Sequence, residues 1–177
     1  LAFNNNIEYS VLEINELETF KDKKIVVAKN LIKAITEECE IKKYKEIKTF
    51  KGSELAGTIC SHPFIKMGYN YDVPMLDGQF VNLDQGTGIV HCAPSHGADD
   101  FILCLKNNIP SLYTVDNAGL YTKEIPHFTG THVFKADPIV IEKLKDQNKL
   151  LKDNKLIHSY PHSWRSKAPL IYRATPQ

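Results

Sequence analysis

Glycine and proline interrupt the middle of this chain so often that no long helix or strand fits between Cys60 and Pro94. The apolar runs there are short, and each is followed by a residue that turns or stops the backbone. The interrupting residues are Pro63, Gly68, Pro74, Asp77-Gly78 and Gly86-Thr87-Gly88. The pattern predicts a succession of short strands and turns, with the best strands at 79–83 and 89–92.

The flanking segments have the periodicities of longer elements. Alternating apolar and polar residues predict strands at 9–14 and 24–28, and β-forming residues among lysines predict an exposed edge strand at 41–50. Helical spacing predicts helices at 30–39, after Gly97 and from Asp137-Pro138, the last with a buried stripe of Val140, Ile141 and Leu144. Further short strands are expected at 156–157 and 170–172. The sum is an α+β fold, with a β-barrel-like core of short strands flanked by helices.

Composition limits the class of protein. The 177 residues contain 22 Lys and Arg against 21 Asp and Glu, a net charge of +1, so any contact with nucleic acid must be local. Hydrophobic residues are 42% of the chain, yet no apolar stretch approaches the ~20 residues that span a bilayer, and no signal peptide opens it. The four cysteines include no Cys-x-x-Cys, which argues against a disulfide framework or zinc ribbon. We expect one soluble, cytoplasmic domain without a membrane partner.

Reactive side chains are concentrated where the 89–92 segment gives way to a helix. They are His91, Cys92, His96, Asp99 and Asp100. A cysteine hydrolase using His91 and Cys92 is disfavoured, because neighbours on a strand point to opposite faces. A metal site would add His158 and His162 to these histidines, but no established ligand spacing supports it.

A third interpretation is a small polar pocket. Asp100 would bind a cation, His91 would shape the wall, and amides of the Gly86-Thr87-Gly88 turn would donate hydrogen bonds. Purely structural roles compete with it, since acidic residues suit a helix's first turn and Thr87 can satisfy its own turn. The residues favour the structural role for Asp99, leave both roles open for Asp100, and favour a capping or turn role for His96.

Three long motifs resemble a known family. GTGIVHCAPSHGADDF (Gly86 to Phe101), DVPMLDGQFVNLDQ, and HSYPHSWRSKAPLIYRATPQ ending at Gln177 are similar to the editing insertion of isoleucyl-tRNA synthetases. The order and separation of the motifs fit, and the resemblance covers the whole chain. It implies the class I synthetase editing-domain fold, with residues 1–177 as one editing domain of a larger synthetase. Residues 156–177 would then be the returning connection to the catalytic domain.

The resemblance also implies an activity, the hydrolysis of mischarged valyl-tRNA(Ile). A pocket for isoleucine gains only about 1–3 kcal/mol from the extra methylene, a limit for which isoleucyl-tRNA synthetase is itself the established example. A second sieve must therefore accept valine and exclude isoleucine. The implied partners are the 3′ end of tRNA(Ile), its amino acid and the rest of the synthetase. ATP and Mg would serve the catalytic domain, and editing would need no cofactor or metal.

Residue roles follow from the same resemblance. Asp100 matches the carboxylate that holds the α-ammonium of the esterified amino acid, and His91 matches the residue that excludes isoleucine sterically. Gly86, Thr87 and Gly88 match the turn beside the terminal adenosine and the ester. A positioned water would attack the ester.

The sequence departs from the family pattern at two places, and alternative functions therefore stay open. Family members carry a threonine-rich segment of the type WTTTPWTLP ahead of the position of Leu1, so we expect this chain to hold one part of the site. Many relatives have Cys-x-x-Cys where Ser163-Trp-Arg-Ser166 stands here, so no zinc is expected. A non-catalytic tRNA-docking module and, less favoured, a metal-dependent hydrolase are the alternatives. Lysines at 41–51 and 149–155 are interpreted as a solvated face in preference to a tRNA contact.

Overall fold

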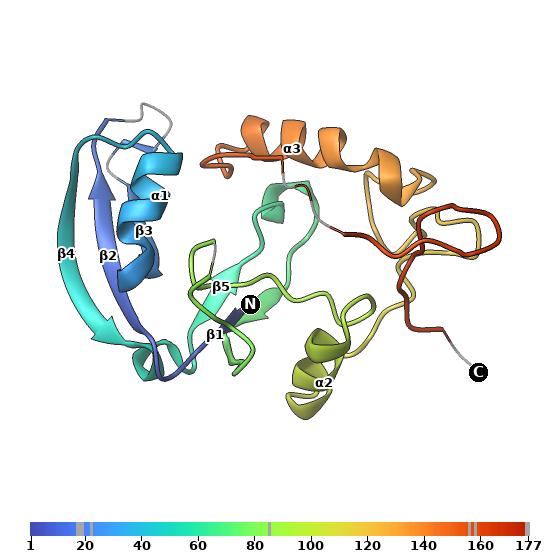
Figure 1. The fold of residues 1–177 in the computed structure, drawn as a ribbon, viewed down its shortest axis with the longest axis horizontal. Coiled ribbons are helices and arrows are strands. Elements are labelled where there is room, and N and C mark those ends of the chain that lie inside the picture. The colour runs from blue at the N-terminus through green and yellow to red at the C-terminus, as the bar shows by residue number, and fades with distance from the viewer. Residues whose placement is uncertain (17–19, 22, 85, 156, 158, 176–177) are drawn as a thin grey trace. The chain divides into compact units, whose positions relative to one another are not determined.

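The computed structural model describes residues 1–16, 20–21, 23–84, 86–155, 157 and 159–175. They belong to two compact units, of which unit 1 is Leu1–Cys92 with Asp146–Leu151 and unit 2 is Ala93–Lys145 with Lys152–Gln177. The strands are β1 Ala2–Phe3, β2 Glu8–Ile14, β3 Lys23–Ala28, β4 Tyr44–Lys51, β5 Ile59–Ser61, β6 Asp72–Pro74 and β7 Leu76–Asp77 (Figure 1). The α-helices are α1 Ile32–Glu38, α2 Ala98–Lys106 and α3 Asp137–Asp146. The mixture of strands and helices confirms the α+β class.

The core of unit 1 is a three-stranded antiparallel sheet of order β3-β2-β4. The middle strand, β2, is the most buried, and Tyr9, Leu12 and Ile14 are each 0% exposed. Helix α1 lies against this sheet and contributes Ile32 and Ile35 to the same core (Figure 1). The sequence correctly predicts these three strands and the helix, including the edge position of β4.

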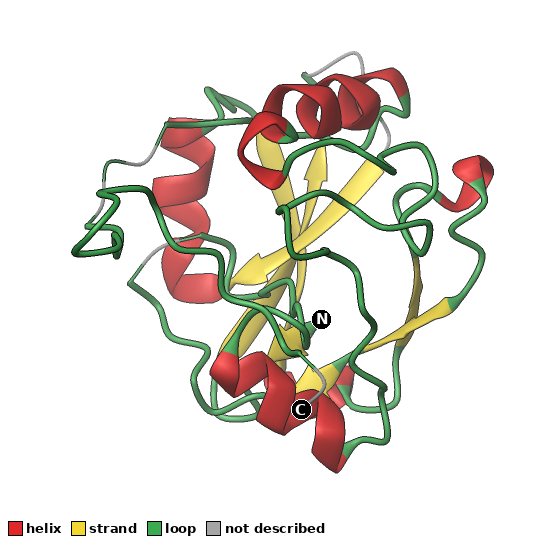
Figure 2. Ribbon diagram, turned by 90° about the vertical axis from the view of Figure 1, so that its right-hand side faces the viewer, coloured by secondary structure: helices red, strands yellow, loops and turns green. Residues whose placement is uncertain are grey.

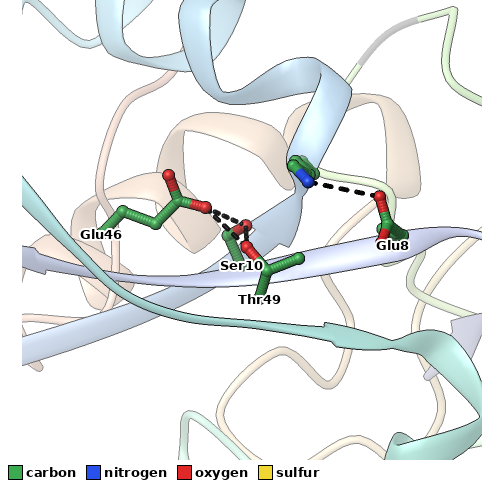
Figure 3. Close-up of polar contacts among 5 residues, drawn as sticks. Glu8, Ser10, Glu46 and Thr49 are labelled. Carbon is green, nitrogen blue, oxygen red and sulfur yellow. Dashed lines mark hydrogen bonds and ion pairs between the residues drawn. The ribbon is translucent and has the colours of Figure 1, made fainter.

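A β-bulge in β4 creates a polar cluster on this sheet. Val11 pairs with Lys48 but Leu12 pairs with Glu46, so Ile47 is the extra residue, and Glu46 comes to the same face as Thr49. The Ser10 and Thr49 hydroxyls each donate to Oε1 of Glu46, both at 2.7 Å (Figure 3). These bonds hold the pKa of Glu46 below its ordinary value, and Ser10 makes the larger contribution.

The remaining strands of unit 1 are very short. β1 pairs in parallel with β7, and β5 pairs antiparallel with β6. β6 ends at Pro74, which has no N–H, and Gly78 follows β7 directly. Loops and turns make up much of the chain outside the strands and helices (Figure 2). Within the described residues the sheets contain two, three and two strands and none closes, so a complete barrel is not formed.

Three strands predicted from the sequence are not strands. Residues 79–83 form a turn, because Val81 N–H bonds to the Gly78 carbonyl at 3.0 Å. Residues 89–92 make a single bridge, in which Val90 exchanges hydrogen bonds with Ala2. Residues 170–172 have no strand partner within the described part of the chain, and the Tyr172 carbonyl accepts a hydrogen bond from the His96 ring instead. The prediction at 156–157 falls partly outside the described residues.

Unit 2 contains α2 and α3 joined by turns. Both helices begin where the sequence predicts, α2 after Gly97 and α3 at Asp137. The predicted apolar stripe of α3 is half-buried instead of fully buried. On α2 only Cys104 is buried, whereas Phe101 and Leu105 are exposed. No helix in the described part of the chain has both the length and the apolar composition that a membrane crossing requires.

The polar cluster predicts a measurable change in Ser10→Ala. Losing one hydroxyl donor should raise the pKa of Glu46 towards its ordinary value. Because the folded pKa is depressed, these bonds stabilise the fold above the unfolded pKa, and the stabilisation is lost as pH falls through the folded pKa. NMR titration of the Glu46 carboxyl measures the shift, and Thr49→Val is the matched control with the smaller expected shift. An unchanged Glu46 pKa in Ser10→Ala would contradict the assignment.

Candidate functional site

The predicted site residues are divided between the two units. Gly86, Thr87, Gly88 and His91 belong to unit 1, and the boundary falls between Cys92 and Ala93. Asp100 belongs to unit 2. The site is therefore described as two groups of residues, each within its own unit.

The Gly86–Gly88 turn is bonded to the central sheet of unit 1. The Thr87 carbonyl accepts from Ala28 N–H at 2.8 Å, and the Gly88 carbonyl accepts from the Tyr9 hydroxyl at 2.7 Å. A Cβ on Gly88 would lie 2.5 Å from Ala28 Cβ, closer than two carbons can approach. Glycine is thus required at 88 by contact as well as by its positive φ of 75°. The turn is fixed by packing before any ligand arrives.

The Thr87 side chain is engaged within its own turn. Its hydroxyl donates to the Ile89 carbonyl at 3.0 Å and accepts from Ile89 N–H at 3.3 Å. These are the contacts of a residue that satisfies its turn backbone. The side chain is exposed, so a role beside a ligand stays a prediction.

His91 lies near an aromatic cluster of unit 1 that sequence reasoning missed. The His62 ring stacks on Tyr69 with centroids 4.8 Å apart and lies 5.2 Å from the exposed Tyr71 ring. Burial lowers the pKa of His62, and the charge of His91 lowers it further. Phe64 N–H donates to Nδ1 of His62 at 3.0 Å, which places the proton of the neutral ring on Nε2. The spacing of these four aromatic residues within 62–71 is the only sequence signal for the cluster.

In unit 2, Asp100 lies in the first turn of α2 and is half-buried. Its Oδ2 accepts from the Ala93 N–H at 2.9 Å, so the carboxylate reaches back seven residues and closes the Ala93–Gly97 turn. One helical turn further on, burial raises the pKa of the Cys104 thiol and the charge of Asp100 adds to that rise. Asp99, its neighbour, is exposed.

The turn that precedes α2 also holds the C-terminal segment of unit 2. His96 contacts the Tyr172 carbonyl through Nδ1 at 2.7 Å and the Thr114 hydroxyl through Nε2 at 2.9 Å. Since a carbonyl can only accept, Nδ1 carries a proton. Ala174 N–H donates to the Ser95 carbonyl at 2.7 Å. The ring of His96 is therefore a bridge between two segments, a role that the sequence left open.

Arg173 adds to this attachment by donating to the Val115 carbonyl and to Oδ1 of Asn117.

The sequence also left open a metal site. Among the described residues, no three His, Cys, Asp or Glu side chains are grouped so that they could hold a metal ion. His162 donates through Nδ1 to the Tyr160 carbonyl at 2.7 Å, and His158 lies outside the described residues. None of the four cysteines, all of which are described, forms a disulfide.

The fold is that of a known class of synthetase domain. The crystal structure of GlLeuRS-CP1 matches 90% of this chain and 77% of its own, with a TM-score of 0.65 and 15% sequence identity. No protein-family model matches the chain. The fold class is accordingly that of the CP1 editing domain of an aminoacyl-tRNA synthetase.

Sequence comparison finds similarity to one kind of synthetase. The chain is 62% identical over all 177 residues to the isoleucine–tRNA ligase of Pelagibacter ubique, covering 20% of that protein. It is 42% identical to the isoleucine–tRNA ligase of Gluconobacter oxydans, over all of this chain and 20% of that protein. It is 40% identical to that of Saccharophagus degradans, over all of this chain and 18% of that protein. The chain thus spans about one fifth of the relatives it matches. These matches confirm the resemblance of the chain to isoleucine–tRNA ligases.

The glycine turn supplies a matched pair of variants. Gly86→Ala introduces a side chain at a φ of +73° but into open space, and should cost about 1–2 kcal/mol of unfolding free energy. Gly88→Ala has the same backbone strain and also overlaps Ala28, so its cost should be clearly larger. Urea unfolding of the two variants measures the difference. Equal costs would show that the Gly88–Ala28 approach is not tight.

Proposed function

We propose that this chain is the editing domain of an isoleucine–tRNA ligase and that it hydrolyses valyl-tRNA(Ile). The observation that carries the proposal is the fixed carboxylate of Asp100, within a chain that is similar over its whole length to isoleucine–tRNA ligases. The CP1 fold supports the same function. The partners would be the tRNA 3′ end, its esterified amino acid and the rest of the ligase chain.

Asp100 binds the α-ammonium group of the esterified amino acid in this proposal. The Ala93 amide holds Oδ2, and among the described residues no recorded hydrogen bond uses Oδ1. One oxygen is thus fixed while the other can accept from an ammonium. A charge-assisted bond to a half-buried carboxylate is stronger than one between neutral groups. Asp100 therefore orients the substrate and takes no part in bond breaking.

His91 selects the amino acid by size. Burial lowers the pKa of its neighbour His62, which stacks on Tyr69, and the charge of His91 lowers that pKa further. An imidazole ring at 91 beside an aliphatic side chain can pack against valine and overlap the additional methylene of isoleucine.

The reaction itself is ester hydrolysis by water. The water oxygen bonds to the carbonyl carbon, the ester C–O bond breaks, and the ribose hydroxyl leaves with the proton that the water gave up. The Gly86–Gly88 turn, already fixed by Tyr9 and Ala28, orients the ester for this attack. The ester is already activated, so positioning supplies the main rate enhancement and no cofactor or metal is needed from this chain.

Substitution of Asp100 tests the proposal in a full-length ligase that contains this segment. Asp100→Ala should slow deacylation of valyl-tRNA(Ile) about 10- to 100-fold, the range for loss of a hydrogen bond to a charged group. Asp100→Asn keeps an oxygen for Ala93 N–H, so it should retain stability and still lose deacylation. Asp99→Asn, which changes the exposed neighbouring carboxylate, is the control. Full deacylation by Asp100→Asn would refute the ammonium role.

Substitution of His91 tests the size selection separately. His91→Ala should allow the ligase to hydrolyse correctly charged isoleucyl-tRNA(Ile), because the steric barrier is removed. His62→Ala is a control that disturbs the aromatic cluster without removing the imidazole at 91. The measurement is the release of isoleucine from isoleucyl-tRNA(Ile). If the correct product stays protected in His91→Ala, another residue is the sieve.

The same preparations separate the alternatives. Binding of tRNA without hydrolysis by the intact ligase would favour the docking module. Stoichiometric metal in an elemental analysis, with loss of activity on chelation, would favour the metal-dependent hydrolase.

A further inference from the structure

We propose that Gly97 is a positioning residue for Asp100, because the absence of a side chain at 97 makes the space in which the carboxylate lies. The inference rests on the proposed role of Asp100 in editing, and it adds a residue that neither the motifs nor the comparisons assign. Gly97 and Asp100 both lie in unit 2, at the start of α2.

The contact is direct. A Cβ built on Gly97 would lie 2.5 Å from Oδ2 of Asp100 and 2.9 Å from its Cγ. Both distances are below any real carbon contact, so an alanine at 97 and the observed Asp100 side chain cannot coexist. The overlap involves the oxygen that Ala93 N–H holds at 2.9 Å. An alanine would therefore displace the carboxylate from its only recorded partner among the described residues.

Backbone conformation does not explain the glycine. Gly97 has φ −112° and ψ 137°, an extended conformation open to any residue. Gly88 differs in this respect: a Cβ there would also meet another residue, but its positive φ already requires glycine. At 97 the demand is for space alone.

Helix capping explains the glycine no better. Gly97 is the N-cap of α2 and makes no side-chain cap bond, whereas Ser, Thr, Asp or Asn would provide one. Asp100 occupies the third helical position, where an acidic side chain ordinarily reaches back to the N-cap N–H. Here the Gly97 N–H bonds to the Ala93 carbonyl instead, and Asp100 reaches further, to Ala93 N–H. This longer reach takes the carboxylate across the Cβ position of residue 97.

The nature of the overlap makes the inference testable. The atom that an alanine would meet is the far end of a flexible side chain, which can rotate away without moving the backbone. Gly97→Ala should therefore fold with Asp100 turned out of place. The variant would lose the position of the carboxylate but keep its charge.

The first measurement is independent of catalysis. In the full chain, NMR hydrogen exchange of the Ala93 amide should be faster in Gly97→Ala than in the wild type, and similar to that in Asp100→Ala. Gly130→Ala is the matched control in the same unit, because Gly130 has a φ of +78° and no atom within 4 Å of its Cβ position. That control should lose stability through backbone strain and leave the Ala93 amide protected. Wild-type exchange of Ala93 in Gly97→Ala would overturn the proposal.

The second measurement is a double-mutant cycle in the full-length ligase. Gly97→Ala should slow valyl-tRNA(Ile) deacylation by no more than the about 10- to 100-fold expected for Asp100→Ala, because its effect passes through the same carboxylate. In an Asp100→Ala background the same change should have less than about a twofold effect, since no carboxylate is left to displace. If the rate losses of Gly97→Ala and Asp100→Ala multiply in the double variant, the positioning role is overturned. If the single variant is unstable and the double variant regains stability, the overlap is equally supported.

The two measurements distinguish failure of this inference from failure of the proposed function. If Asp100→Ala leaves deacylation unchanged, the editing role of Asp100 fails, and the Ala93 amide still decides whether Gly97 places the carboxylate. If Asp100→Ala is impaired but Gly97→Ala is not, the editing role stands and the positioning role fails.

Discussion

The hydroxyl of Tyr9 joins the parts of unit 1 on which the proposed site depends. It donates to the Gly88 carbonyl and accepts from Asn4 N–H, while the Tyr9 ring lies in the core at 0% exposure and stacks near Phe50. Because Tyr9 lies on the central strand β2, its hydrogen bond attaches the glycine turn directly to the sheet. A buried hydroxyl with both a donor and an acceptor contact is fully satisfied, so the polar group adds order without an unpaired atom. The extended N-terminal segment, the sheet and the turn are thus joined at one side chain.

Periodicity predicted the elements whose pairing is local or regular. The strands β2 and β3, the edge strand β4 and the starts of helices α2 and α3 follow from alternation, lysine content and the residues that precede each helix. It failed where short apolar runs form no ladder. Val81 is 3% exposed, yet it closes a turn on Gly78, whereas Val90 is exposed and, among the described residues, forms a single bridge with Ala2. A short apolar run by itself therefore does not predict strand pairing.

The sequence predicts which residues belong to the site but not the contacts that they make. The resemblance gave Asp100 and His91, but the bond from Asp100 to Ala93 and the aromatic cluster around His62 depend on folding of the backbone. Gly97 has no side chain, so its residue type suggests no chemistry. Its proposed role depends on the space that the missing side chain leaves for Asp100, and that space is apparent only in the folded chain. Asp100 itself combines two roles that sequence reasoning had set against each other, since the carboxylate that would bind substrate also closes the turn before its helix.

The His96 bridge has a consequence for the C-terminal segment of unit 2. Nδ1 donates to the Tyr172 carbonyl, and Nε2 contacts the Thr114 hydroxyl. An imidazole ring is planar and rigid, so the distance between its two nitrogens is fixed. The ring therefore acts as a spacer of constant length, and it sets the positions of Thr114 and Tyr172 together.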